Sequence, residues 1–156
     1  YINLAENVSI VKVLEISKEE LDAFPLEKWE KIGDKVYAEG KWTIKQIFQH
    51  MVDTERVFGY RALCFARGEA AQLPSFDENS YADNADVTHR SLAEIIEEFK
   101  LVKATTIALF RSFTDEMLLK TGVASSSTYS VLAAGFIIAG HQRWHFRVVE
   151  ERYAHL

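Results

Sequence analysis

The sequence predicts an all-α protein, an antiparallel four-helix bundle with long connections between the first and second helices and between the second and third. Only two prolines and seven glycines occur in 156 residues, which favours long helices over many short strands. Four segments of roughly 20 residues each carry apolar side chains at helical spacing. No internal repeat is evident, so we expect a single domain spanning residues 1–156.

The first two predicted helices have clear boundaries. The first runs from Ala5 to Phe24 and stops at Pro25, with its apolar residues at Val8, Val11, Leu14, Leu21 and Phe24. The second begins near Thr43, whose hydroxyl suits an N-cap, and continues to about Arg67, directly before Gly68.

The other two predicted helices are separated from their neighbours by polar segments. Residues 91–94 form a capping box that starts a helix ending near Phe113. Before it, Glu69–Val87 contains Pro74 and many Asp and Asn residues, so we predict a long loop, which in a compact domain is usually functional or disordered. A polar stretch, Thr121–Ser130, leads into the last helix, Ser130–Tyr153.

Composition excludes several classes of partner. A net charge of −5 argues against a nucleic-acid-binding surface. The longest apolar run, Val131–Ala139, is less than half of the roughly 20 residues that a membrane span needs. The single Cys64 fits a reducing compartment, and no signal peptide is recognisable, although the chain begins at Tyr1 and not at Met. We therefore expect a cytoplasmic protein.

Two histidines on the last predicted helix suggest a metal site. His141 and His145 lie within SVLAAGFIIAGHQRWHFRVVEERY, an otherwise largely apolar segment. A spacing of four residues places both imidazoles on one face, about 6 Å apart along the axis. One helix can offer two nitrogen ligands to one ion in this way, although two ordinary interfacial histidines explain the pair equally well.

A third histidine could complete the site. His50 lies in the middle of the second predicted helix, at the edge of its apolar stripe, whereas His89 and His155 lie where we expect solvated side chains. Three imidazoles would leave open positions for water or substrate. Such a site could lower the pKa of bound water or hold a thiol as its thiolate, and imidazole alone does not select the metal.

Two familiar metal motifs are absent from the sequence. In the segment His141-Gln-Arg-Trp-His145, Gln142 stands where a zinc protease carries its catalytic glutamate. Three residues before the candidate ligands the chain has Ile47, Ile138 and Gln142, so it lacks the Glu-x-x-His pairs of di-iron bundles. We therefore expect neither that type of peptidase nor a carboxylate-bridged pair of metals.

Five further side chains are candidates for the surroundings of the site. Asp53 fits a hydrogen-bond partner of His50 and a solvated acid equally well. Thr54 could reach metal-bound water, but simple packing is favoured. Arg61 lies about 16 Å from His50 along the helix. It could bind the anionic end of a long substrate, although a surface ion pair is favoured. Tyr81 could cover the pocket or tie its loop to the bundle, and Trp144 fits the core or a pocket wall.

Three segments of the chain together resemble the DinB/YfiT-like superfamily of small four-helix-bundle metalloenzymes. They are TIKQIFQHMVDTERVFGYRALCFARG, LPSFDENSYADNAD and IIAGHQRWHFRVVEERY, and the likeness extends from Trp29 to Tyr153. By this resemblance His50, His141 and His145 correspond to the metal-binding triad of the family. The resemblance implies one divalent ion, nickel or zinc first and iron or manganese as alternatives, and a homodimer.

The resemblance also implies a reaction. The characterised branches are mostly thiol-dependent S-transferases, which join a low-molecular-weight thiol such as bacillithiol or mycothiol to a small electrophile. This is the first functional hypothesis. The alternatives are a non-catalytic metal- or ligand-binding stress-response bundle and a metal-dependent hydrolase. In a further alternative the histidines are structural, in a dimer without metal.

Overall fold

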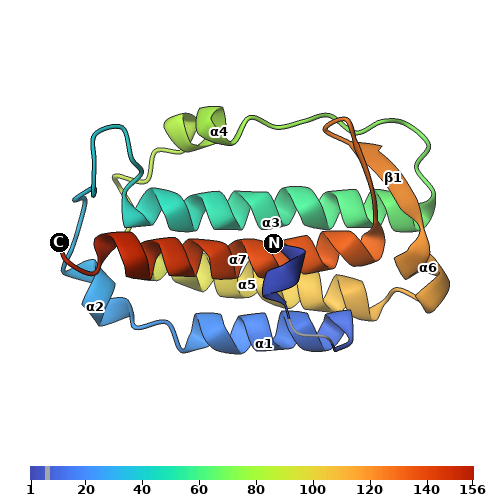
Figure 1. The fold of residues 1–156 in the computed structure, drawn as a ribbon, viewed down its shortest axis with the longest axis horizontal. Helices are drawn as coiled ribbons and strands as arrows, with labels where there is room; N and C mark the ends of the chain where they lie inside the picture. Colours follow the sequence, from blue (N-terminus) through green and yellow to red (C-terminus); the bar gives the residue numbers. More distant parts are fainter. Residues whose placement is uncertain (6–7) are drawn as a thin grey trace.

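Four long helices form a bundle in the computed structural model, which describes residues 1–5 and 8–156 (Figure 1). The helices are α1 (Ile10–Asp22), α3 (Ile44–Arg67), α5 (Leu92–Arg111) and α7 (Val131–Tyr153). Both α1 and α3 pack against α5 and α7, so α1 and α3 lie diagonally across the bundle. The predicted all-α four-helix bundle is confirmed. None of the described helices combines the length and apolar character that crossing a membrane requires.

The long connections determine the directions of the helices. Helix α3 runs opposite to α7, and α1 runs opposite to α5, so only these two neighbouring pairs follow the predicted antiparallel arrangement (Figure 1). The neighbours α3 and α5 run in the same direction, because the chain after α3 returns along the outside of the bundle through α4 (Glu78–Asn84) before α5 begins (Figure 1).

Side-chain caps fix where the long helices begin. The Thr43 hydroxyl accepts from the Gln46 amide, while the Gln46 side chain accepts from the Thr43 amide. Ser91 and Glu94 form the same reciprocal pair at the start of α5, as predicted. Such pairs satisfy amide groups that have no partner inside the helix. At the other end of α3, Gly68 takes a left-handed φ of 84° that favours glycine.

The predicted first helix is too long at its N-terminal end. Residues 2–4 form a short 3-10 helix, and Ala5 after it is extended. Helix α1 starts only at Ile10, because the Ser9 hydroxyl caps it by accepting from the Lys12 amide. Residues 6 and 7 of the prediction lie outside the described residues. The helix ends at Asp22, two residues before the predicted end.

The predicted connections contain secondary structure of their own. Short helices α2 (Leu26–Glu30) and α6 (Asp115–Leu119) follow α1 and α5, and Asp77 caps α4 inside the predicted loop. The polar stretch before α7 is a hairpin of β1 (Thr121–Ala124) and β2 (Ser127–Ser130), with Thr121 opposite Ser130. The sequence prediction missed the hairpin because its turn, Ser125-Ser126, takes φ values of 52° and 63° without the Asn or Gly that usually marks them.

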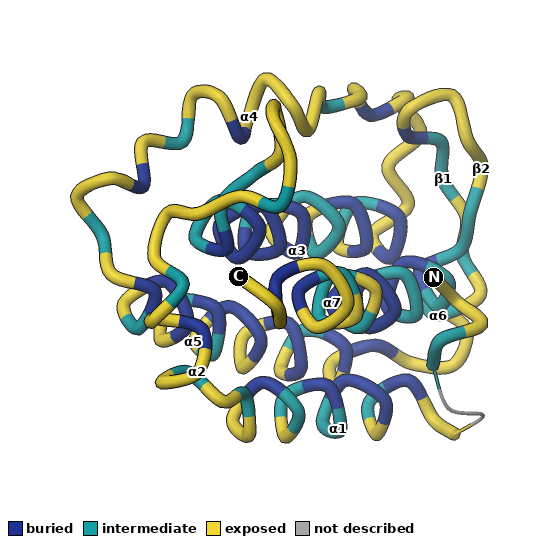
Figure 2. The backbone as a smooth tube through the Cα atoms, turned by 60° about the vertical axis from the view of Figure 1, so that its left-hand side comes forward, coloured by how far each residue is buried: buried dark blue, intermediate teal, exposed yellow. Residues whose placement is uncertain are grey.

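The core consists of two apolar clusters with a polar layer between them. On each long helix the buried apolar residues of one cluster precede those of the other along the chain, and most buried polar residues fall in the gap, although His50 lies just before it, between Phe48 and Met51. The polar layer comprises Ser17 on α1, His50, Thr54 and Glu55 on α3, Lys103 and Thr106 on α5, and His141 and Gln142 on α7. Figure 2 shows the buried inner faces of these helices. Buried polar side chains need partners, so the residues of this layer are expected to contact one another.

Candidate metal centre

The structure brings the three predicted histidines together inside the polar layer. His50 comes from α3, and His141 and His145 come from the adjacent helix α7. The His141 Nε2 atom lies 3.0 Å from His50 Nε2 and 3.1 Å from His145 Nε2. The Nε2 atoms of His50 and His145 thus both lie close to His141 Nε2, and the potential ligand atoms of the three residues lie within 4.8 Å of one another.

This arrangement fits a divalent metal ion. Ligands about 2.0–2.1 Å from one ion stand roughly 3.0 to 3.4 Å apart, depending on the coordination angle, and the two distances from His141 Nε2 fall in that range. A neutral imidazole offers one N–H and one lone pair, so three converging Nε2 atoms cannot all satisfy one another through hydrogen bonds. A cation among them would bind three lone pairs at once.

Burial keeps the imidazoles in the form that binds metals. It lowers the pKa of His50 to about 4 and, together with the neighbouring His50, lowers the pKa of His145 to about 3. The pKa of His141 is also well below its usual value, first because of burial and then because of the two neighbouring imidazoles. At neutral pH all three rings are uncharged, and no proton needs to leave before a metal binds.

Three side chains orient His50. The Thr54 hydroxyl lies 3.4 Å from His50 Nδ1, where it can accept an N–H of the ring and so leave the Nε2 lone pair free for a metal. The Trp42 ring packs against the imidazole with 4.9 Å between centroids. From the end of α7, the Tyr153 hydroxyl donates to the Trp42 carbonyl and so holds this segment in place. His145 Nδ1, in contrast, is buried without a hydrogen-bond partner among the described residues.

Gln142 points away from the histidines. Its amide donates to the Ser17 carbonyl over 2.7 Å and accepts from the Ser17 hydroxyl over 2.9 Å, which links α7 to α1 inside the core. The position that holds the glutamate of a zinc protease therefore serves helix packing in this chain.

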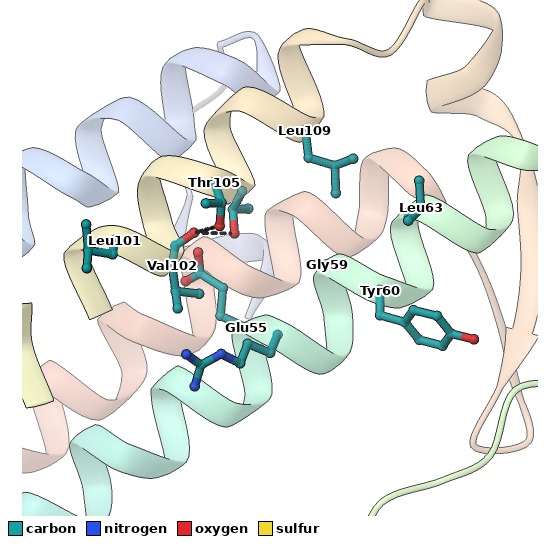
Figure 3. A pocket seen from close by; sticks show the side chains of 10 residues that line it. Glu55, Gly59, Tyr60, Leu63, Leu101, Val102, Thr105 and Leu109 are labelled. Carbon is teal, nitrogen blue, oxygen red and sulfur yellow. Dashed lines mark hydrogen bonds between the residues drawn. The ribbon is translucent and has the colours of Figure 1, made fainter. Parts of the chain in front are cut away.

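Cavities adjoin the triad on two sides. One has a volume of about 360 Å³, includes His141 and Thr54 in its wall, and extends along α3 to Arg61. The other has a volume of about 240 Å³ and includes His145 and Trp42 in its wall. A third hollow of about 520 Å³ lies between α3 and α5, where Tyr60, Leu63 and Leu101 surround it (Figure 3). It contains no residue of the triad.

Arg61 is buried, so the favoured prediction of a surface ion pair is wrong. Only 3% of the residue is exposed. The guanidinium donates to the Pro74 carbonyl and the Ser125 hydroxyl, both over 2.9 Å, and approaches the Tyr129 hydroxyl at 3.4 Å. These partners come from the α3–α4 connection and from the hairpin, segments whose conformation the sequence did not reveal.

The remaining predicted surroundings lie at varying distances from the triad. Asp53 accepts from Gln49 over 3.0 Å and faces Arg56, so it is not the partner of His50. Tyr81 is 48% exposed and packs on Phe76. Trp144 is 44% exposed and meets the Tyr1 ring. As predicted, His89 and His155 are exposed.

Sequence reasoning did not identify two aromatic residues that adjoin the site. The Trp42 ring packs on His50. Tyr129 lies in the wall of the cavity beside His141, and its hydroxyl faces Arg61. Trp42 stands only one residue before the N-cap Thr43, which could have placed it about two turns of α3 from His50. Tyr129 gave no such signal, because its position depends on the hairpin.

Comparison with known proteins supports the fold. A family model described as DinB superfamily matches residues 10–149. YfiT from Bacillus subtilis, described as a probable metal-dependent hydrolase with an unusual four-helix bundle topology, superposes with a TM-score of 0.77 at 18% identity, covering 91% of this chain and 82% of that one. Comparison with curated proteins gives no match. Because the family model covers most of its length, this chain belongs to the DinB superfamily.

Proposed function

We propose that this chain is a divalent-metal-dependent enzyme whose single ion is held by His50, His141 and His145. The convergence of the three Nε2 atoms at 3.0 and 3.1 Å carries the proposal. A divalent ion in this position supplies Lewis-acid chemistry that favours loss of a proton from a thiol or a water molecule near neutral pH. The chain itself contributes three neutral imidazoles, an orienting contact from Thr54 and the walls of the adjoining cavity.

The reaction that we propose is transfer of a low-molecular-weight thiol to a small electrophile. Cavities adjoin the triad at His141 and at His145, and two compartments provide room for two reactants. In such a transfer the sulfur bonds to the electrophilic carbon, the leaving group departs with the electrons of its bond, and the thiol proton passes to solvent. Imidazole ligands suit nickel and zinc, which we propose as the ions, with iron and manganese as alternatives.

Metal analysis of purified protein without a histidine tag tests the ion. We expect one divalent ion per chain, and we expect His50→Ala and His141→Ala to lose it. His89→Ala serves as the matched control, because it removes an exposed imidazole and leaves the triad intact. A wild-type protein that takes up no stoichiometric metal would refute the proposal.

A separate assay tests the reaction. The metal-loaded protein is given several thiols together with halogenated or epoxide electrophiles, and formation of thioether is measured. We expect turnover that requires both metal and thiol. A metal-loaded protein that is inactive with every pair of thiol and electrophile would refute the transfer reaction. It would favour a protein that binds metal without catalysis, such as a metal-binding stress-response bundle.

Hydrolysis is the second candidate, and the likeness of the fold to YfiT, itself described as a probable metal-dependent hydrolase, favours it. Hydrolysis needs only water as the second reactant. Ester or amide cleavage that requires metal but proceeds at full rate without thiol would favour it over transfer.

We also propose that the protein is a homodimer. The hollow between α3 and α5 is bordered by exposed apolar side chains, with Leu101 70% and Tyr60 59% exposed (Figure 3). Exposed apolar surface of this kind favours association. Sedimentation should show a dimer that Leu101→Glu converts to a monomer, and a monomeric wild-type protein would refute this assignment.

A cytoplasmic location completes the proposal. Cys64, the single cysteine of the sequence, is a half-buried free thiol that a reducing compartment would preserve. Fractionation of cells that express the protein should recover it with cytoplasmic markers, and recovery with secreted proteins would contradict this location.

A further inference from the structure

The cavity beside His141 has a buried cation at the end away from the triad. Arg61 lies seven residues after Thr54 on α3, which is about 10 Å along the helix. Both residues line the cavity of about 360 Å³. The cavity therefore extends from the proposed metal site to the guanidinium of Arg61, a residue that is only 3% exposed.

The guanidinium has neutral partners only. Its hydrogen bonds reach a carbonyl and two hydroxyls, those of Pro74, Ser125 and Tyr129. Among the described residues Arg61 has no carboxylate within ion-pair distance. The one acidic residue in the cavity wall, Glu78, is exposed and does not pair with it. A buried charge without a counter-charge is unfavourable, so this arrangement favours an anionic ligand.

Apolar side chains line the space between the two ends. Phe58, Phe76 and Ile137 contribute to the wall, and the Phe58 and Phe76 rings also lie 5.1 and 5.8 Å from the Arg61 guanidinium carbon. The Tyr129 ring packs near Phe58, with 6.0 Å between centroids. A cavity with apolar walls and a few polar groups at defined points is typical of a small-molecule site.

We propose that this cavity binds a small carboxylate whose charged group lies at Arg61 and the Tyr129 hydroxyl, and whose apolar or aromatic body lies between Phe58, Phe76 and Ile137. The opposite end of such a molecule reaches His141. Placing the reacting group there rests on the proposed function, whereas the carboxylate site rests on Arg61 alone. The substrate class that follows is a carboxylic acid with an apolar spacer of about 8–10 Å, given the rise of the helix.

Binding of 4-phenylbutyrate, measured by calorimetry, tests this assignment. The uncharged 4-phenylbutan-1-ol has a similar body and serves as the matched ligand. Charge-assisted hydrogen bonds are worth more than neutral ones, so we expect the wild-type protein to prefer the carboxylate by about tenfold or more. Both ligands are titrated into metal-loaded and into chelator-treated protein, which keeps this test independent of metal uptake.

Variants separate binding from a structural role of Arg61. In Arg61→Gln the carboxylate should bind no better than the alcohol, while the alcohol keeps its wild-type affinity. Arg67→Gln is the matched control, because it removes an exposed arginine further along the same helix and should leave both affinities unchanged. If Arg61→Gln lowers both affinities equally, Arg61 only ties the hairpin and the α3–α4 connection together, and the proposal is wrong.

Further outcomes decide the question without that variant. Equal affinity of the wild-type protein for carboxylate and alcohol would overturn the proposal. Arg61→Lys keeps the positive charge, so it should retain a preference for the carboxylate even if Arg61→Gln fails to fold. Loss of that preference in a folded Arg61→Lys protein that still binds the alcohol would show that a positive charge at residue 61 does not hold the carboxylate, and would count against the site.

Discussion

Lys103 Nζ lies 2.6 Å from Glu55 Oε2 in the polar layer of the bundle, and the two side chains are 0% and 2% exposed. This ion pair joins α5 to α3 beside the histidine cluster, and the charge of Lys103 is one of the causes that lower the pKa of His141. Neither side chain has another hydrogen-bond partner among the described residues. Each buried charge is therefore stabilised by the other side chain of the pair.

Breaking this pair from one side should be strongly destabilising. Lys103→Met leaves the Glu55 carboxylate buried without a partner, and we expect a loss of about 3–5 kcal/mol in the free energy of unfolding. Adding Glu55→Gln to the Lys103→Met variant should recover most of the lost stability, because it removes the unpaired charge. Urea unfolding of the single and double variants measures this coupling. Lys100→Met, which breaks the solvent-accessible pairs of Lys100 with Glu97 and Asp22, is the control, with an expected change below about 1 kcal/mol. A single-variant loss that small would contradict our account of the pair.

The stability of chelator-treated protein should decrease in acid. An unfolded imidazole takes up a proton near pH 6.5, whereas burial lowers the pKa of folded His50 to about 4. Between these values the unfolded chain binds more protons, so stability falls as pH falls, and the slope from His50 ends below about pH 4. The effect amounts to about 2 kcal/mol for His50 between pH 7 and 4.5. Urea unfolding at both pH values should show a smaller loss in His50→Gln. An equal loss in both proteins would mean that His50 ionises normally in the fold.

Two glycines should respond in opposite ways to the same substitution. A Cβ at Gly122 would lie 2.0 Å from the Phe65 ring, where β1 packs on α3, whereas a Cβ at Gly59 meets nothing within 4 Å. We expect Gly122→Ala to cost about 1–3 kcal/mol through overpacking. Gly59→Ala should stabilise α3 by about 0.5–1 kcal/mol, because alanine favours the helix. Thermal and urea unfolding measure both, and a neutral Gly122→Ala would show that the hairpin does not pack this closely.

Gln142→Glu recreates the zinc-protease motif in sequence but should not produce its chemistry. The new carboxylate would face the Ser17 carbonyl, which now accepts from the Gln142 amide. Two acceptors in contact inside the core should cost about 2–3 kcal/mol. We expect lower stability and no gain of peptidase activity. A stable variant that cleaves peptides would place residue 142 in the site and contradict the observed geometry.

Local signals account for the parts of the fold that the sequence predicted well. The capping pairs at Thr43 and Ser91 involve residues three apart, so the starts of α3 and α5 could be identified from short stretches of sequence. The same is true of the His141–His145 pair, and helical spacing alone placed His50 at a seam between helices. The hairpin has no such signal, because Ser125 and Ser126 adopt left-handed φ values, and serine is not a residue type that indicates this conformation.

Arg61 shows why the rest of the site could not be predicted. Its partners Pro74 and Ser125 lie 13 and 64 residues further along the chain, in segments that read as irregular and polar. Burial of Arg61 thus depends on tertiary packing of the hairpin and the α3–α4 connection over α3. Without that packing an arginine on a helix is most reasonably assigned to the surface.

The most direct test of the central claim is a crystal structure of the protein loaded with nickel or zinc, with anomalous scattering measured at the absorption edge of the metal. Our account predicts one strong peak per chain, about 2.0–2.2 Å from the Nε2 atoms of His50, His141 and His145. A peak elsewhere, or an ion bound by only two of these histidines, would contradict it.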